Sequence, residues 1–77
     1  MEEYEKRMVT EYKELKSRAE KLSVIINRYY LDSLDFELKC PIELLLAQWH
    51  AMGAYLKILE QRAAIEKINL DSIDHDN

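Results

Sequence analysis

The apolar residues in the first third of the chain recur at spacings that alternate between four and three. They are Met8, Tyr12, Leu15, Ala19, Leu22, Ile26 and Tyr29. Such spacing places one apolar stripe along an α-helix, as in a coiled coil. The acidic Glu3 and Glu5 precede the stripe and Arg28 lies near its end, which suits the helix dipole. The pattern therefore predicts a helix over residues 3–30 that must bury its stripe against another element.

The pattern stops in residues 31–40, where apolar residues alternate with polar ones and two aspartates favour turns. We expect a connector with local extended character. Pro41 disfavours helix at the residue before it and is well accommodated in a first helical turn. A second helix is therefore predicted over residues 41–68.

The second helix carries two apolar stripes. The first contains Ile42, Leu45, Trp49, Met52, Leu56, Leu59 and Ala63. The second contains Leu44, Ala51, Tyr55, Ile58 and Ile65, interrupted by Gln48 and Arg62. One partner helix covers only one stripe, so the second is predicted to be exposed and to mark a protein contact. We interpret Trp49 and Met52 as core residues, and Gly53 as a weak sign of a close helix crossing.

Composition agrees with an all-α fold, because one Gly and one Pro are too few for turn-rich β folds. We expect a two-helix antiparallel hairpin forming a single domain over residues 1–70, followed by a disordered acidic tail over residues 71–77. A chain of 77 residues is marginal as a monomer. The hairpin is therefore predicted to assemble into a homo-oligomeric helical bundle.

The net charge of −4 and the short apolar runs predict neither non-specific nucleic acid binding nor a membrane span. Residues 6–28 are nevertheless locally basic, with seven Lys and Arg against three Glu, which allows a confined anion site. The start at Met1 without a signal peptide and the single Cys40 suggest a cytosolic protein.

No catalytic, metal or cofactor site is predicted. His50 and His75 are far apart in the sequence, and Cys40 stands alone. No acid, base and nucleophile converge by spacing, so we do not expect an enzyme.

A polar stripe runs beside the apolar one on the first helix. It contains Tyr4, Arg7, Glu11, Glu14, Arg18, Lys21, Ile25 and Arg28. One interpretation is a solvated ladder of ion pairs four residues apart, such as Arg7 with Glu11. The other is a phosphate pocket that uses Arg18 and Lys21, completed when copies assemble.

Gln48, Tyr55 and Arg62 are seven residues apart within the second stripe of the second helix. Because a buried guanidinium needs a partner, Arg62 must meet an acid, a carbonyl, water or a ligand anion. Two interpretations stay open. The three residues form a hydrogen-bond network between subunits, or they bind a nucleotide, with Tyr55 stacking on its base and Arg62 holding its phosphate.

Three segments carry a resemblance to a known family: YEKRMVTEYKELKSRAEKL in residues 4–22, CPIELL in 40–45, and QxxxMxxYLxILExR in 48–62. The chain resembles a family of small proteins of tailed phages and prophages, named after a crAss-like phage member. Its hairpin architecture also looks like that of the phage sponge proteins that inhibit CBASS and Thoeris defence. Those proteins bind cyclic nucleotide signals between subunits without cleaving them.

The resemblance implies a non-enzymatic phage anti-defence protein in the host cytoplasm that sequesters a cyclic nucleotide or a related signal. The resemblance supplies no binding motif, so the predicted ligand-binding residues come from the stripes of the two helices: Arg18, Lys21, Gln48, Tyr55 and Arg62. The alternative hypothesis is an acidic helical interaction module that inhibits a host defence protein, such as a nuclease or a CRISPR effector. An assembly role in the phage particle is a further alternative.

Overall fold

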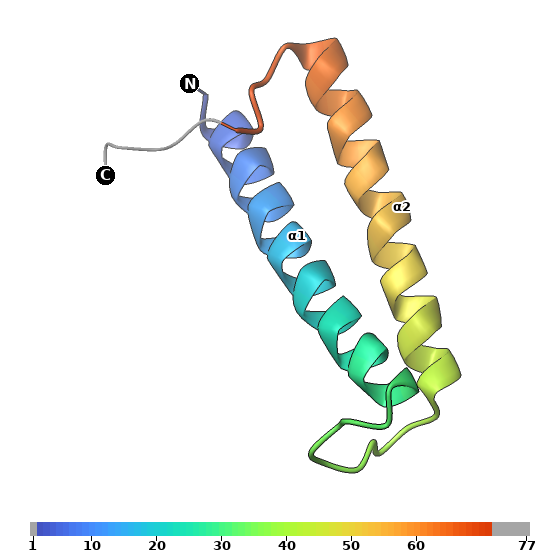
Figure 1. The fold of residues 1–77 in the computed structure, drawn as a ribbon. Helices are drawn as coiled ribbons and strands as arrows, with labels where there is room; N and C mark the ends of the chain where they lie inside the picture. The colour runs from blue at the N-terminus through green and yellow to red at the C-terminus, as the bar shows by residue number, and fades with distance from the viewer. Residues whose placement is uncertain (1, 72–77) are drawn as a thin grey trace.

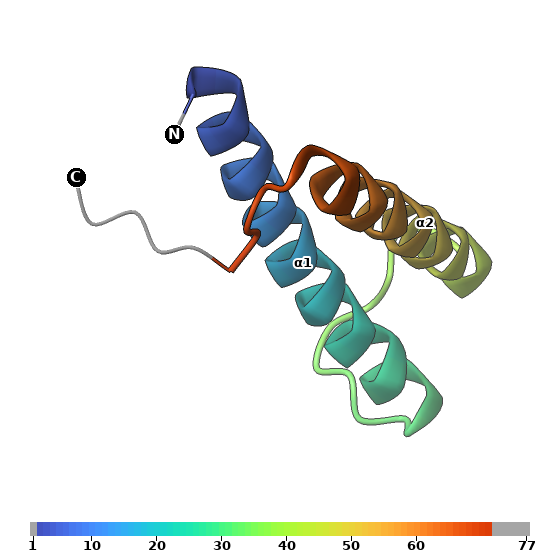
Figure 2. The same cartoon turned by 90° about the horizontal axis from the view of Figure 1, so that it is seen from above.

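Two long helices joined by a connector make up the computed structural model, which describes residues 2–71 (Figure 1). Helix α1 spans Glu3–Tyr30 and α2 spans Ile42–Glu66. The chain turns back after α1, so α2 runs antiparallel to it (Figure 1). Figure 2 shows the two helices crossing at an angle, with the end of α2 next to the first half of α1. The predicted all-α, two-helix hairpin is confirmed. Over residues 2–71, neither helix is both long and apolar enough to cross a membrane.

Local hydrogen bonds mark both ends of α1. At its start, the backbone N–H of Glu2 donates to the Glu5 carboxylate at 2.9 Å. At its end, the N–H of Ser33 donates to the carbonyl of Arg28 at 2.8 Å. Asp32, which lies between Arg28 and Ser33, takes a left-handed backbone conformation with φ 57°. Aspartate tolerates this conformation better than most residues do. The connector therefore leaves the helix through a turn at residues 31–32 and continues with bends at residues 35–36 and 39–40.

Helix α2 begins directly after Pro41 and ends two residues before the predicted boundary at residue 68. Lys67 takes a left-handed conformation with φ 59°, which stops the helix. The N–H of Ile68 then donates to the carbonyl of Ala63 at 2.9 Å. This reversal returns the Ile68 side chain to the core, where it is buried. Residues 72–77, most of the predicted acidic tail, lie outside the described residues.

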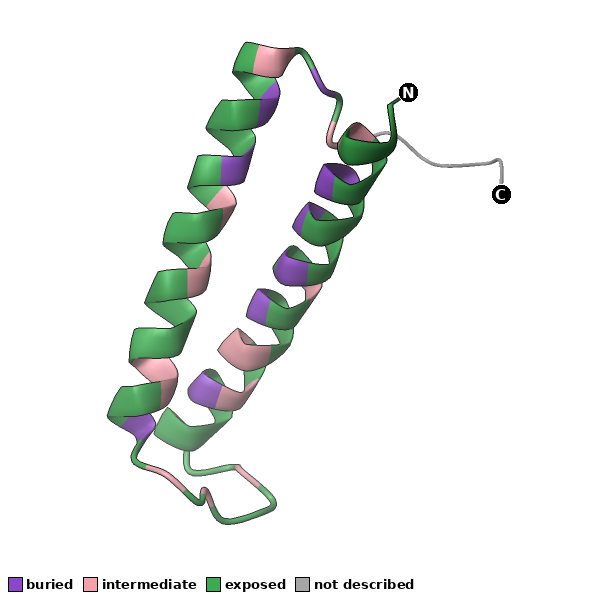
Figure 3. Ribbon diagram, turned by 180° about the vertical axis from the view of Figure 1, so that it is seen from behind, coloured by how far each residue is buried: buried purple, intermediate pink, exposed green. Residues whose placement is uncertain are grey.

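The main core lies where the start of α1 meets the end of α2. Its buried members are Met8, Val9, Tyr12, Leu15, Leu59, Ala63 and Ile68, with Met52, Leu56 and Leu70 packed against them. Leu59 is fully buried. Figure 3 shows the buried residues of α1 as a stripe on the side that faces α2. At the opposite end of the hairpin, Ile26 and Ile42 are also buried.

The structure corrects the predicted burial of two stripe residues. Trp49 is 37% exposed rather than a core residue, and Tyr29 is also exposed. Trp49 borders the same hollow as Ala19 and Ser23 of α1, whose side chains are too short to cover an indole. The prediction for Gly53 is also wrong, because a Cβ atom added there would meet nothing within 4 Å. Within residues 2–71, no close helix crossing requires this glycine.

The second stripe of α2 is exposed, as its spacing predicts. We call Leu44, Ala51, Tyr55, Ile58 and Ile65 the outer face of α2; all five are exposed. Ile65 is the extreme case at 80% exposure. The hairpin thus leaves a row of exposed apolar side chains, interrupted by Gln48 and Arg62, on the surface of α2.

Candidate functional site

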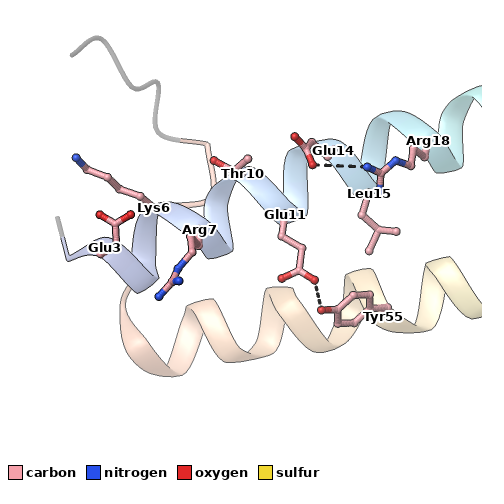
Figure 4. Close-up of a pocket in the computed structure, with 9 residues that line it drawn as sticks. All are labelled: Glu3, Lys6, Arg7, Thr10, Glu11, Glu14, Leu15, Arg18 and Tyr55. Carbon is pink, nitrogen blue, oxygen red and sulfur yellow. Dashed lines mark hydrogen bonds and ion pairs between the residues drawn. The ribbon is translucent and has the colours of Figure 1, made fainter. Parts of the chain in front are cut away.

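A groove on the flank of the hairpin collects charged side chains of α1 around one aromatic ring of α2. We call it the Tyr55 groove; its volume is about 480 Å³. Its lining residues are Glu3, Lys6, Arg7, Thr10, Glu11, Glu14, Leu15, Arg18 and Tyr55 (Figure 4). Four of them belong to the polar stripe of the first helix, because residues three and four apart share one helical face.

Tyr55 connects the two walls of this groove. Its hydroxyl donates a hydrogen bond to the Glu11 carboxylate (Figure 4). That bond is the main reason why the pKa of Tyr55 is raised, and the positive charge of Arg62 acts in the opposite direction. Tyr55 is 39% exposed, so part of its ring is accessible from the groove.

The positive charges of the groove differ in how they are paired. The Arg18 guanidinium lies 3.6 Å from the Glu14 carboxylate, four residues away on the same helix. Both side chains are largely exposed, so this ion pair is weak and can open for a ligand. Arg7 and Lys6 have no ion-pair partner among residues 2–71. The groove therefore offers two cations that no carboxylate of the described chain neutralises directly.

The structure places the five predicted ligand-binding residues in two groups. Arg18 and Tyr55 line the Tyr55 groove, whereas Lys21, Gln48 and Arg62 do not. Arg62 instead lies 3.7 Å from the Glu66 carboxylate of its own helix. The Arg62 side chain is also 52% exposed, so both water and an acid are available to this guanidinium.

Sequence reasoning missed the role of Glu11 and undervalued Arg7. The spacing of four residues suggests an ion pair between these two side chains. In the structure, Glu11 accepts a hydrogen bond from Tyr55, and Arg7 has no ion-pair partner within residues 2–71. The sequence did contain a signal for both residues, because Arg7 and Glu11 belong to the polar stripe of the first helix.

No cluster of residues in the described chain suggests a metal centre. Within residues 2–71, no group of three His, Cys, Asp or Glu side chains is placed to hold a metal ion. Cys40 is a free, half-buried thiol. His75 lies outside the described residues.

The fold and this groove define a small all-α helical hairpin with a mixed-charge surface site between its helices. The chain belongs to the Sequestin family, whose pattern matches residues 2–65. The match covers α1 and all but the last residue of α2, and so includes every residue that lines the Tyr55 groove. No curated protein and no solved structure matches the chain.

Proposed function

We propose that this protein is a non-enzymatic binding protein that sequesters a small nucleotide-derived signal in the Tyr55 groove. One observation carries the proposal: a partly exposed aromatic ring lies in the same groove as Arg7 and Arg18. The family name Sequestin supports it, because the name suggests a sequestering role. A cyclic nucleotide used as a defence signal, a phage origin and a location in the host cytoplasm are parts of this proposal.

The chemistry of the groove suits a nucleotide better than a simple anion. Three acids and three cations line it, so its formal charge is balanced. Guanidinium groups bind phosphate oxygens in a bidentate manner. Carboxylates such as Glu14 accept hydrogen bonds from ribose hydroxyls and amino groups of bases, and a tyrosine ring stacks on a base. A ligand with an anionic end and a donor-rich, aromatic end matches this distribution.

Assembly into a homo-oligomer is part of the same proposal. Leu44, Ile58 and Ile65 are exposed on the outer face of α2, and a second copy would remove them from water. Tyr55 belongs to that face and also lines the groove, so the assembled interface would border the ligand site. Lys21, Gln48 and Arg62 extend the proposed site in the assembled state.

A second candidate function rests on the same exposed face. An interaction module that inhibits a host defence protein needs an apolar contact surface, and the outer face of α2 supplies one. A role in phage assembly would use it too. In either case the partner is a protein, and the Tyr55 groove needs no ligand.

Native mass spectrometry tests the proposal. The purified protein is measured alone and with a mixture of cyclic dinucleotides, cyclic trinucleotides and cyclic ADP-ribose isomers. We expect an oligomer that gains one defined ligand mass and releases the ligand intact on denaturation. Intact release would also support the absence of enzymatic turnover.

Variants locate the site in the same experiment. The double variant Arg7→Gln/Arg18→Gln should lose the added mass, whereas Lys39→Gln removes a charge outside the groove and should keep it. Ligand binding by the double variant at wild-type strength would contradict the proposed site. A wild-type protein that gains no nucleotide mass but captures a stoichiometric host protein would favour the interaction module.

A further inference from the structure

A second groove lies between the two helices and shares no lining residue with the Tyr55 groove. We call it the Trp49 groove; its volume is about 580 Å³, within the usual range for small-molecule sites. Its lining includes the short side chains of Ala19 of α1 and Ala54 of α2, and the backbone of Gly53 of α2. These residues leave room for a flat molecule between the helices.

Two features of this groove are left uncovered by the described chain. Gly53 stands in the middle of α2, where glycine weakens a helix. A Cβ atom added there would nevertheless meet nothing within 4 Å. Beside it, Trp49 is 37% exposed, although tryptophan carries the largest apolar side chain. Its ring meets His50 in an edge contact with 5.4 Å between ring centroids. An occupant that covers both Trp49 and Gly53 would account for the two features together.

The charge around the groove indicates the nature of that occupant. Lys16 from α1 and Lys57 from α2 both line it, against one acid, Glu20. Lys57 has no ion-pair partner among residues 2–71. The Lys16 ammonium lies 5.9 Å from the centroid of the Tyr12 ring, a contact that leaves its charge unneutralised. The groove therefore joins an aromatic surface to a surplus of positive charge.

We propose that the Trp49 groove is a second ligand site, which binds a flat heteroaromatic molecule with an anionic group, of the nucleoside monophosphate class. The ring stacks on Trp49 above Gly53, and the phosphate is held by Lys16 and Lys57. Stacking on an aromatic side chain and charge-assisted hydrogen bonds supply the binding energy. This site does not depend on the function proposed for the Tyr55 groove.

The chain contains one tryptophan, so fluorescence excited at the red edge of its absorption reports on this groove alone. AMP is the ligand tested, and adenosine, which lacks the phosphate, is the matched control. We expect AMP to quench Trp49 emission saturably and adenosine to bind roughly tenfold more weakly, because it lacks the charge-assisted contacts. Unsaturable quenching, or equal affinity for both compounds, would overturn the proposal.

Three variants distinguish the groove from the rest of the surface. Gly53→Leu fills the open space with a good helix former and should abolish quenching while the circular dichroism spectrum stays helical. Lys16→Gln/Lys57→Gln should reduce AMP affinity to the level of adenosine. Lys39→Gln, which removes a charge in the connector, should leave the affinity unchanged. AMP quenching that survives in Gly53→Leu would rule out this site.

Two further measurements distinguish a ligand in the Trp49 groove from a second copy that covers this groove and from a ligand in the Tyr55 groove. Trp49 emission that shifts with protein concentration in the absence of AMP would show that a second copy covers the groove, and would overturn the proposal. The Arg7→Gln/Arg18→Gln variant should retain the AMP response, because those residues line the other groove. Loss of the response in that variant would place the ligand in the Tyr55 groove instead.

Discussion

The Tyr12 hydroxyl on α1 donates a hydrogen bond to the Glu60 carboxylate on α2 at 2.8 Å, across 48 positions of sequence. A second bond runs in the opposite direction, from Tyr55 on α2 to Glu11 on α1, across 44 positions. Each bond pairs one residue of α1 with one residue of α2. Together with the apolar core they set the register of the hairpin, because a shift of either helix would break both.

Loss of the Tyr12 hydroxyl should weaken the hairpin. A hydrogen bond to a charged group contributes about 1.5–3 kcal/mol, and the partly buried position of this one places it near the lower value. We expect Tyr12→Phe to lower the free energy of unfolding by about 1–2 kcal/mol in urea denaturation at pH 7. The matched control is Tyr30→Phe, at an exposed tyrosine, which should change stability little. Equal effects of the two substitutions would contradict the role of this bond.

The same hydroxyl should make stability depend on alkaline pH. The hydrogen bond to Glu60, with burial and the charges of Glu60 and Asp71, raises the pKa of Tyr12 from 10 to about 12. Because the folded pKa lies above the unfolded one, the stabilisation is complete below pH 10 and is lost as the pH rises through about 12. The stability difference between wild type and Tyr12→Phe should therefore shrink over this interval. A difference that stays constant from pH 9 to about 12 would disprove the assignment.

Two leucines of the apolar stripes should respond differently to truncation. Leu59 is fully buried, so Leu59→Ala should cost about 2–5 kcal/mol and unfold much of the protein at 25 °C. Leu22 is only half-buried, and Leu22→Ala should cost about 1–2 kcal/mol. Thermal denaturation followed by circular dichroism measures both variants. A reversed order would mean that the core lies elsewhere along the hairpin.

A single methyl group at Gly53 should stabilise α2. Nothing lies within 4 Å of the position that a Cβ atom would take, and alanine is favoured over glycine in a helix by about 1 kcal/mol. Gly53→Ala should therefore raise the unfolding midpoint in urea. A fall in the midpoint would show that another chain or molecule occupies this space in solution.

Charges on the outer face of α2 should prevent assembly without unfolding the hairpin. Ile58 and Ile65 are exposed, so Ile58→Glu/Ile65→Glu removes no contact with the core of the described chain. In sedimentation equilibrium we expect this variant to be a helical monomer and the wild type to be an oligomer. A wild type that is already monomeric at micromolar concentration would contradict the proposed assembly.

The sequence by itself determined the two helices and the exposure of the second stripe of α2. The range predicted for the first helix, residues 3–30, coincides with α1 because hydrophobic period and terminal charges are local properties. The outer face was predictable for a similar reason: a helix with two apolar stripes and one partner must expose one of them. Neither conclusion required knowledge of which residues face each other.

Only the tertiary structure decided the partners of individual side chains. The pairing of Glu11 with Tyr55, and not with Arg7, depends on the register between helices, which spacing along one helix does not contain. The exposure of Trp49 likewise depends on the small residues Ala19 and Ser23 on the opposite helix. Both grooves depend on contacts of this kind. A groove is shaped by the sizes of the side chains that two helices bring together. Periodicity within one helix specifies only the direction of each side chain.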